Sequence, residues 1–281
     1  MNQAIVSLKN VSYRYPHTAG SDAPALADIN LDIAAGEFVG LVGANGSGKS
    51  TLARLLNGLI TPTCGDVLID GLTTADPANL DQIRETVGMV FQNPESQIVA
   101  TSVEDDIAFG LENLGLPSVE IERRVGEAAR RFGIETLRQS EPHWLSGGQK
   151  QRTVLAGVVS LEPKLLVLDE PTSMLDPRSQ REFRGYVEEL WHGGATVIYV
   201  TQLMEEIATA LRVVALAGGR IAFDGFPAEF FSSRELLAET GLEAPLAARL
   251  TTGLKSHGCP LPMALTLPEL VANVYSQSRQ K

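Results

Sequence analysis

Residues 37–56 read EFVGLVGANGSGKSTLARLL, and this stretch decides the fold. An apolar segment, Glu37–Val42, is followed by a glycine-rich loop and then by leucines at helical spacing. The loop satisfies the pattern G-x-x-x-x-G-K-[ST] from Gly43 to Ser50, directly after a strand and before a helix, as the pattern requires. A glycine turn that merely ends a strand would not need a lysine and a serine at these two places. The stretch therefore predicts a nucleotide-binding site.

The residue types in this loop suit phosphate. Glycines let successive backbone N–H groups surround phosphate oxygens, and the following helix adds its positive N-terminal end. Lys49 is expected to reach the terminal phosphates and act in catalysis, and the Ser50 hydroxyl to face Mg²⁺. The predicted nucleotide-binding residues of the loop are Gly43, Asn45, Gly46, Ser47, Gly48, Lys49, Ser50 and Thr51.

A second stretch, KLLVLDEP at residues 164–171, places two acids after four apolar residues. Asp169 is expected at the carboxyl end of a buried strand, next to the phosphate loop if the two strands are near neighbours, where it would hold the Mg²⁺ shell. Glu170 is placed to orient or deprotonate the attacking water. The alternative is a solvated acidic turn before Pro171, which is a weak interpretation beside a phosphate loop.

A third stretch, LSGGQ at residues 145–149, is another glycine-bearing helix start. Its backbone N–H groups and the Ser146 hydroxyl are suited to bind phosphate. An ordinary helix cap by Ser146 is the alternative, and both hold together because a cap and an anion site share one geometry. The predicted residues are Ser146, Gly147, Gly148 and Gln149.

Short segments rich in valine and isoleucine recur along the chain between helix-period stretches, which indicates an α/β fold. The strands near Glu37–Val42 and Leu165–Leu168 are apolar on both faces, as buried parallel strands are, whereas the first strands alternate. We therefore predict a parallel core with an antiparallel flank. A helical insertion is expected at about residues 93–160, and a boundary near Gly225 separates residues 1–224 from a helical C-terminal domain, 225–281. The other predicted strands are Ile5–Val11, Val67–Ile69, Val87–Phe91, Val197–Val200, Val213–Leu216 and Ile221–Phe223.

Composition excludes several classes of protein. The chain has 281 residues, 44% of them hydrophobic, so it is long enough for a large core. Its formal net charge of −11 argues against a nucleic-acid partner. Two cysteines at unrelated positions support neither a disulfide scaffold nor a zinc site. No long apolar run and no hydrophobic signal core occur, so any membrane role is expected to be indirect.

Together, GANGSGKST, LSGGQ, LLVLDEP and the stretch Ser173–Asp176 resemble an ATPase subunit of the ABC type, over roughly residues 4–224. The resemblance implies a P-loop NTPase fold, ATP and Mg²⁺ as ligands, and a head-to-tail dimer. In such a dimer each ATP lies between the phosphate loop of one subunit and the LSGGQ segment of the other. This arrangement would explain why the LSGGQ segment begins a helix suited to an anion but has no phosphate of its own.

The resemblance assigns further residues. Gln92, in VFQNP, matches the glutamine that senses Mg²⁺ and water, although a surface turn would also suit it. Tyr15, in SYRYP, matches the aromatic residue that stacks on adenine; strand packing is the alternative, and it also suits the neighbouring Tyr13. Asp176 matches the aspartate of the family's D-loop.

One position departs from the family. Gln202, in YVTQLMEE, stands where a histidine usually follows the strand, and His17, His143, His192 and His257 offer no replacement at that spacing. A glutamine amide still donates a hydrogen bond to a γ-phosphate but carries no positive charge. We therefore expect nucleotide binding to be kept and the hydrolysis rate to be lowered.

A more specific resemblance lies in the stretch FQNPESQIVATSVEDDIAFGLEN and in the tail. Both are similar to the ATPase subunit of energy-coupling factor (ECF) transporters, a subunit related to cobalt importer ATPases. It implies work at the cytoplasmic face of the cell membrane with a membrane T component, which contacts the helical region, and an S component that captures a vitamin or a transition-metal ion. The acidic VEDDIAFGLEN stretch would receive a basic coupling helix, or is simply a solvated helix face. The second ATPase is either another copy or a different subunit.

The tail offers an apolar face for assembly or for packing within the chain, made of Phe226, Phe230, Phe231 and Leu236–Leu237. Two other functions share the nucleotide motifs. A nucleic-acid-remodelling ATPase is disfavoured by the acidic charge and the absence of a long heptad insertion. An ATP-gated scaffold without hydrolysis would suit Gln202 but not the retained Glu170.

Overall fold

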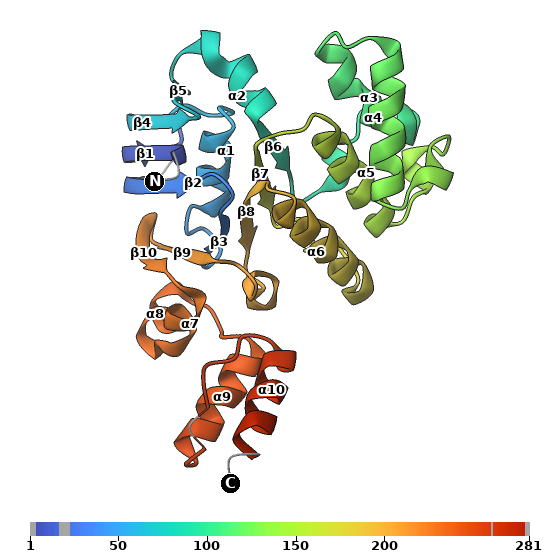
Figure 1. The fold of residues 1–281 in the computed structure, drawn as a ribbon. Coiled ribbons are helices and arrows are strands. Elements are labelled where there is room, and N and C mark those ends of the chain that lie inside the picture. Colours follow the sequence, from blue (N-terminus) through green and yellow to red (C-terminus); the bar gives the residue numbers. More distant parts are fainter. Residues whose placement is uncertain (1–3, 17–22, 260, 279–281) are drawn as a thin grey trace.

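The computed structural model describes residues 4–16, 23–259 and 261–278. Six strands form the central sheet in the order β10-β9-β3-β8-β7-β6 (Figure 1). Neighbours from β9 to β6 run parallel, whereas β10 pairs antiparallel with β9. Strand bounds are β3 (Phe38–Val42), β6 (Val87–Val90), β7 (Leu165–Asp169), β8 (Thr196–Thr201), β9 (Arg212–Ala217) and β10 (Arg220–Gly225).

An antiparallel sheet, β2-β1-β4-β5, forms the flank. Its strands are β1 (Ala4–Tyr13), β2 (Leu26–Ala34), β4 (Cys64–Ile69) and β5 (Leu72–Thr73). In β2, alternate residues such as Leu31 and Ile33 are buried while polar residues between them face outward. This alternation is typical of a strand with one buried face, and β2 is a strand of the flank that the predicted ranges do not include. The α/β fold with a parallel core and an antiparallel flank is confirmed.

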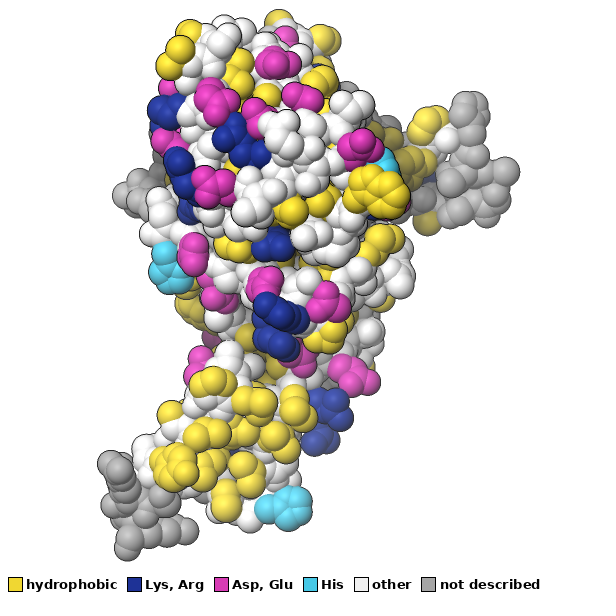
Figure 2. Space-filling model, turned by 90° about the vertical axis from the view of Figure 1, so that its right-hand side faces the viewer, with side chains coloured by type: hydrophobic (Ala, Val, Ile, Leu, Met, Phe, Trp, Pro, Cys, Tyr) yellow, Lys and Arg dark blue, Asp and Glu magenta, His cyan; other side chains and the backbone are white. Residues whose placement is uncertain are grey.

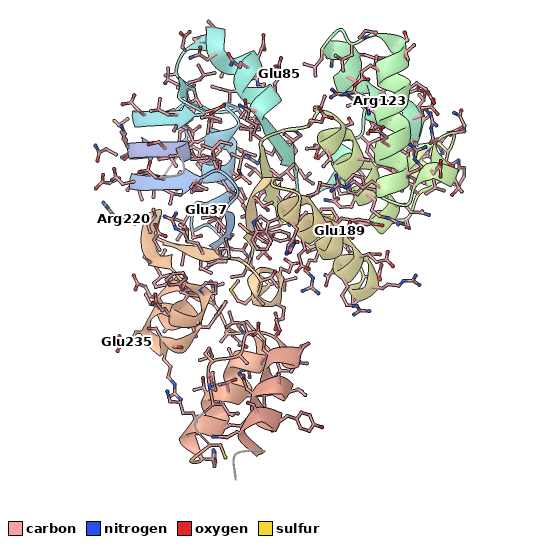
Figure 3. The ribbon with its side chains drawn as sticks, in the orientation of Figure 1. Glu37, Glu85, Arg123, Glu189, Arg220 and Glu235 are labelled. Carbon is pink, nitrogen blue, oxygen red and sulfur yellow. The ribbon has the colours of Figure 1, made fainter. Side chains whose placement is uncertain are left out.

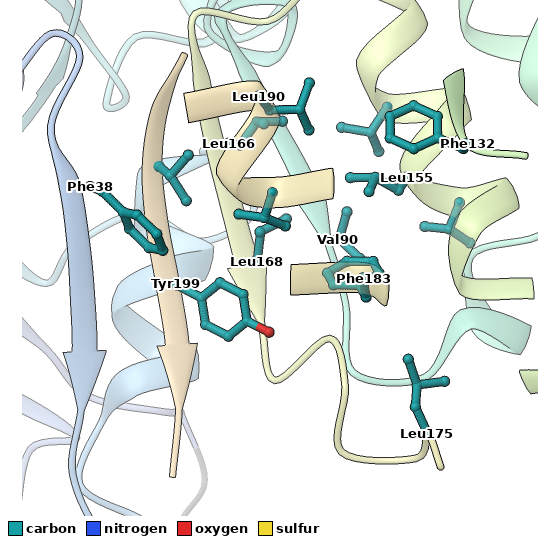
Figure 4. Close-up of a cluster of buried hydrophobic side chains, with 14 of the residues drawn as sticks. Phe38, Val90, Phe132, Leu155, Leu166, Leu168, Leu175, Phe183, Leu190 and Tyr199 are labelled. Carbon is teal, nitrogen blue, oxygen red and sulfur yellow. The ribbon is translucent and has the colours of Figure 1, made fainter. Parts of the chain in front are cut away.

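The core lies on both faces of the central sheet. Leu166 and Leu168 of β7 face one hydrophobic cluster, and Leu165 and Val167 face the other. Figure 4 shows the first cluster, in which side chains of α6 (Pro177–His192) cover the sheet. On the opposite face lies α1 (Lys49–Leu56). Since full burial of such a side chain contributes roughly 1.5–3 kcal/mol, this packing fixes the strand ends that carry the site.

Helices dominate the chain between β6 and β7. They are α3 (Val103–Asn113), α4 (Ser118–Arg131) and α5 (Gly147–Ser160), and they pack side by side beyond α6 (Figure 1). Arg123 lies on the outer face of α4, where it pairs with Glu120 and Glu127 (Figure 3). The helix α2 (Leu80–Thr86) precedes β6. This region therefore forms a lobe with an apolar interior and a charged outer surface.

After β10, the remaining described elements are helical: α7 (Pro227–Ser232), α8 (Arg234–Thr240), α9 (Leu246–Ser256) and α10 (Leu267–Ser278). Phe230 and Phe231 are buried against the main core, so they pack within the chain, whereas Phe226 is exposed. A separate small cluster holds α9 and α10 together. No helix within the described residues has the length and apolar content needed to cross a bilayer.

Candidate functional site

The phosphate loop connects β3 to α1, and its glycines are required by both conformation and space. Gly43, Gly46 and Gly48 have positive φ angles of 148°, 76° and 107°. A Cβ atom on Gly43 would lie 2.4 Å from the Leu216 carbonyl oxygen, and one on Gly48 would lie 2.7 Å from that of Ala25. Side chains at these two positions would therefore force the loop away from the adjacent strands.

Lys49 lies across this loop and is buried. Its Nζ donates to the carbonyl oxygens of Gly43 at 2.8 Å and Ala44 at 3.1 Å, and lies 3.9 Å from the Glu170 Oε1 atom. Burial lowers the pKa of Lys49, and the carboxylates of Glu170 and Asp169 oppose that shift. The ammonium group is thus held between the loop and two acids, where a terminal phosphate would replace carbonyl oxygens as its partner.

Asp169 ends β7 and meets the first turn of α1. Since β8 separates β7 from β3, the two strands are not adjacent, yet the Ser50 hydroxyl donates to Asp169 Oδ1 at 3.1 Å. Burial raises the pKa of Asp169, the Ser50 hydrogen bond lowers it, and the Glu170 carboxylate raises it further. Desolvation therefore disfavours the charged carboxylate, and a nearby cation would favour it.

The oxygen atoms of Ser50 and Asp169 fit Mg²⁺, which prefers oxygen ligands. In the described part of the chain, no group of three or more His, Cys, Asp or Glu side chains converges as a metal site. Mg²⁺ is commonly bound by one or two protein ligands together with phosphates and water, so this pair is sufficient.

Glu170 follows Asp169 with a φ of 48°, an unusual backbone conformation for a residue with a side chain. Its N–H donates to the Val200 carbonyl oxygen at 2.9 Å, which ties the turn to β8. Two glutamine amides hold its carboxylate: Gln92 Nε2 donates to Oε2 at 3.2 Å and Gln202 Nε2 donates to Oε1 at 2.8 Å. The carboxylate is thereby aimed at the mouth of the phosphate loop.

Gln202 also reaches the loop directly. Its Nε2 donates to Asn45 Oδ1 at 2.7 Å, so one amide group links Asn45 to Glu170. The position expected to hold the family's histidine therefore does contact the predicted catalytic acid.

Lys49, Ser50 and Glu170 line one cavity of about 310 Å³, which Tyr15 and Gln92 also line. Asp169 and Gln202 do not line it but are hydrogen-bonded to Ser50 and Glu170, which do. Tyr15 and Thr51 share a hydrogen bond between hydroxyls 3.1 Å apart. Tyr13 is buried in the core and makes an edge contact with Tyr15, so Tyr15 is the better placed aromatic side chain. The cavity lining is Tyr15, Ala25, Asn45, Gly46, Gly48, Lys49, Ser50, Thr51, Gln92 and Glu170.

The LSGGQ segment does not line this cavity. It begins α5 in the helical lobe with a capping box: Gln149 N–H donates to Ser146 Oγ, and Ser146 N–H donates to Gln149 Oε1. Asp176 caps α6, accepting hydrogen bonds from the N–H groups of Arg178 and Ser179. The subunit therefore assembles the phosphate-loop half of the predicted site and keeps the other half apart.

One contact to the phosphate loop has no signal in the sequence. The N–H of Ala44 donates to the carbonyl oxygen of Thr240 at 3.1 Å, which connects the loop to the end of α8. A backbone contact across almost 200 residues leaves no residue pattern by which to find it.

A larger cavity of about 750 Å³ lies elsewhere, where α4 faces the segments that precede β7 and β8. Among its charged side chains, Lys164 pairs with Asp70, and Arg124 pairs with Glu162. It holds none of the predicted site residues, so size does not identify the functional cavity here.

The chain matches the family model described as ABC transporter over residues 26–173. It is 48% identical over 277 residues to the energy-coupling factor transporter ATP-binding protein EcfA1 of Symbiobacterium thermophilum, with 96% of each chain covered.

Two solved structures share the fold. One is cbiO1 from Clostridium perfringens, part of the ABC transporter complex cbiONQ; it is 36% identical with a TM-score of 0.74, over 84% of this chain and 94% of that one. The other is a dimeric post-hydrolysis state of the ATP-binding cassette MJ0796 bound to ADP and Pi, 30% identical with a TM-score of 0.72, over 79% and 98%.

Proposed function

Since this chain belongs to the ABC transporter family, as an ATP-binding subunit of an energy-coupling factor transporter, we propose that Mg-ATP is hydrolysed in the 310 Å³ cavity to energise uptake of a vitamin or a transition-metal ion. The observation that carries the proposal is the convergence of Lys49, Ser50, Gln92 and Glu170 on one cavity, beside Asp169. Tyr15 supplies an aromatic face for adenine at its rim.

Each residue has a role that follows from its contacts. Ser50 and Asp169 would hold Mg²⁺, which neutralises phosphate charge when bound. Lys49 binds the terminal phosphates through its ammonium group. Glu170 accepts the proton of the attacking water, while the amides of Gln92 and Gln202 hold its carboxylate in place.

A second ATPase subunit completes the site. Support comes from the LSGGQ segment, whose helix start suits a phosphate but lies outside the cavity of its own subunit. The MJ0796 cassette of similar fold is dimeric with ADP and Pi bound. In the proposed dimer, Ser146, Gly147, Gly148 and Gln149 of one subunit close over the ATP of the other.

We assign residues 1–224 to ATP binding, about 93–160 of these to the helical lobe, and 225–281 to assembly. Hydrophobic side chains gather on the C-terminal helices (Figure 2). This face of α9 and α10 suits the second ATPase subunit, because α7 and α8 already pack against their own core. Its exposed residues include Leu246, Leu250, Leu267, Val271 and Val274.

A membrane T component would dock on the helical lobe near Gln92, with an S component beyond it, at the cytoplasmic face of the membrane. The acidic start of α3 contributes less charge than its sequence implies. Asp106 accepts hydrogen bonds from Val99 and Ala100, and Glu104 pairs with Arg138. Exposed Val99 and Phe109 support an apolar contribution to this docking surface.

Glu170→Gln tests the proposal. The variant keeps the size of the side chain but accepts no proton, and its single amide oxygen replaces two acceptor oxygens, so phosphate release should fall more than about 100-fold. ATP affinity should be kept, and the ATP-bound dimer should accumulate in light scattering. Unchanged turnover would refute the assignment of Glu170, and absence of ATP binding by the unaltered protein would refute the proposed function itself.

A further inference from the structure

A buried carboxylate, Glu206, joins the two loops that carry the hydrolysis residues. It lies in the short 3-10 helix Met204–Ile207 after β8 and is 6% exposed. Its Oε1 accepts a hydrogen bond from the Thr172 hydroxyl, and its Oε2 accepts one from the Thr201 hydroxyl at 2.5 Å. Neither the phosphate cavity nor the helical lobe includes Glu206.

The two threonines lie next to the residues proposed for hydrolysis. Thr172 follows Glu170 by two residues in the loop after β7, and Thr201 immediately precedes Gln202 after β8. Thr201 also accepts a hydrogen bond from the Leu203 N–H at 2.9 Å, so its hydroxyl shapes the turn that presents Gln202.

Burial makes a carboxylate costly at this place, even with the Arg184 guanidinium in the neighbourhood. Tyr199, also buried, lies in the core with its hydroxyl toward the loop that follows β7 (Figure 4). Burial, followed by the nearby Glu206 carboxylate, raises the pKa of Tyr199. Arg184 sends a hydrogen bond to the Glu205 carbonyl oxygen, not to the Glu206 carboxylate. A buried carboxylate has to be compensated by hydrogen bonds, and here both of them come from the two loops.

We propose that Glu206 is a positioning residue for ATP hydrolysis: by holding Thr172 and Thr201 together, it sets the separation between Glu170 and Gln202. This inference rests on the proposed function. The distance in question is the 2.8 Å between Gln202 Nε2 and Glu170 Oε1. One neutral amide serves both Glu170 and Asn45, so a shift of about 1 Å in either loop would break this contact.

Glu206→Gln is the central test, with Glu205→Gln as the matched control. Glu205 is the adjacent, exposed residue of the same type, so the control removes the same charge without touching either threonine. An amide at position 206 cannot accept from both hydroxyls as the carboxylate does. We expect kcat for ATP hydrolysis to fall about 10- to 100-fold in Glu206→Gln, with KM for ATP and the control nearly unchanged.

A double-mutant cycle separates positioning from general stability. If Glu206 acts through Gln202, adding Glu206→Gln to Gln202→Ala should lower kcat by less than about 2-fold. Independent losses that multiply would overturn the proposal, as would a normal kcat in Glu206→Gln.

Should Glu206→Gln fail to fold, Thr172→Val and Thr172→Ser replace it. Valine removes the hydroxyl that donates to Glu206, whereas serine keeps it, so serine should rescue kcat and valine should not. Equal rates in these two variants would contradict the positioning role. If the proposed function itself were wrong, the unaltered protein would release no phosphate, and this result distinguishes the two failures.

Discussion

The phosphate loop and the LSGGQ segment are two glycine-bearing helix starts within one chain, yet the structure treats them differently. At α1 the N-cap is Gly48, and no side chain accepts hydrogen bonds from the first turn. At α5 the serine and glutamine of LSGGQ satisfy each other in a capping box. No side chain caps the first end, which is therefore open to a phosphate, whereas Ser146 already caps the second.

The side chains around the two helix starts also differ. Three residues that would hydrolyse ATP, Glu170, Gln92 and Gln202, are hydrogen-bonded around the phosphate loop. Beside LSGGQ the structure instead exposes Trp144 to 79%. In the proposed dimer, nearly all of the chemistry would therefore belong to the phosphate-loop half of the site. The LSGGQ half would contribute an anion contact, already formed by its capping box, to the ATP of the other subunit.

Mixed subunits test this division with the largest expected effect. Lys49→Ala should inactivate the phosphate-loop half of the site. Gly147→Asp should inactivate the LSGGQ half, because it places a negative charge against the phosphate. A Cβ at Gly147 meets only ordinary contacts, 3.7 Å from Leu175 Cδ2, so this variant should fold. Each variant alone should lose more than about 100-fold in ATPase rate.

Combining the two variants should restore up to about a quarter of the activity, because half of the dimers are mixed and each contains one intact site. Phosphate release from tagged, co-expressed copies of this chain measures it. Gly148→Asp is the wrong variant for this purpose, since its Cβ would lie 2.5 Å from Ser179 Oγ. No recovery in dimers proven to be mixed would show that both halves act within one subunit.

Gln202 gives the next largest effect and sharpens the account of the loop half. Gln202→Ala removes the donor to Glu170 and Asn45, so hydrolysis should slow by about 10- to 100-fold while ATP binding is kept. Gln202→His should match or exceed the natural rate, since it keeps a donor and adds positive charge when protonated.

Both rates are measured in the assembled transporter. Full activity of Gln202→Ala there would show that this residue has no catalytic part, and that turnover depends on Glu170 or on the partner's site.

Local motifs predicted the parts of the site that depend on short-range order. GANGSGKST, LLVLDEP and LSGGQ each specify a strand or helix end together with the residues that follow. The structure brings the first two to one cavity with Tyr15 and Gln92, and Gln202 is hydrogen-bonded to Glu170 of its lining. The antiparallel flank followed from alternation along the first strands, although β2, which alternates in the same way, was not among the predicted strands.

Pairings between distant backbone segments could not be predicted. Nothing in the sequence indicates that β8 lies between β3 and β7, that Ala44 bonds to Thr240, or that Glu206 bridges Thr172 and Thr201. Such contacts are set by sheet order and by how helices end, which depend on the packing of the whole core. For the same reason, the burial of Phe230 and Phe231 within their own chain was left open by the tail's apolar pattern.

The smallest effect concerns the cap itself, and Ser233 supplies the control. Ser146→Ala and Ser233→Ala each remove a side chain that caps a helix, at α5 and α8 respectively. Each should cost about 1 kcal/mol of stability and lower Tm by about 2–4 °C.

Only Ser146→Ala should also slow hydrolysis, by about 3- to 10-fold, because its hydroxyl is proposed to contact the phosphate bound to the second subunit. ATP affinity of the separate subunit should stay unchanged in both variants, since LSGGQ does not line its cavity. If Ser146→Ala weakened ATP binding by the isolated subunit, the two helix starts would not divide the work between subunits. If Ser233→Ala slowed hydrolysis equally, Ser146 would act only by stabilising its helix.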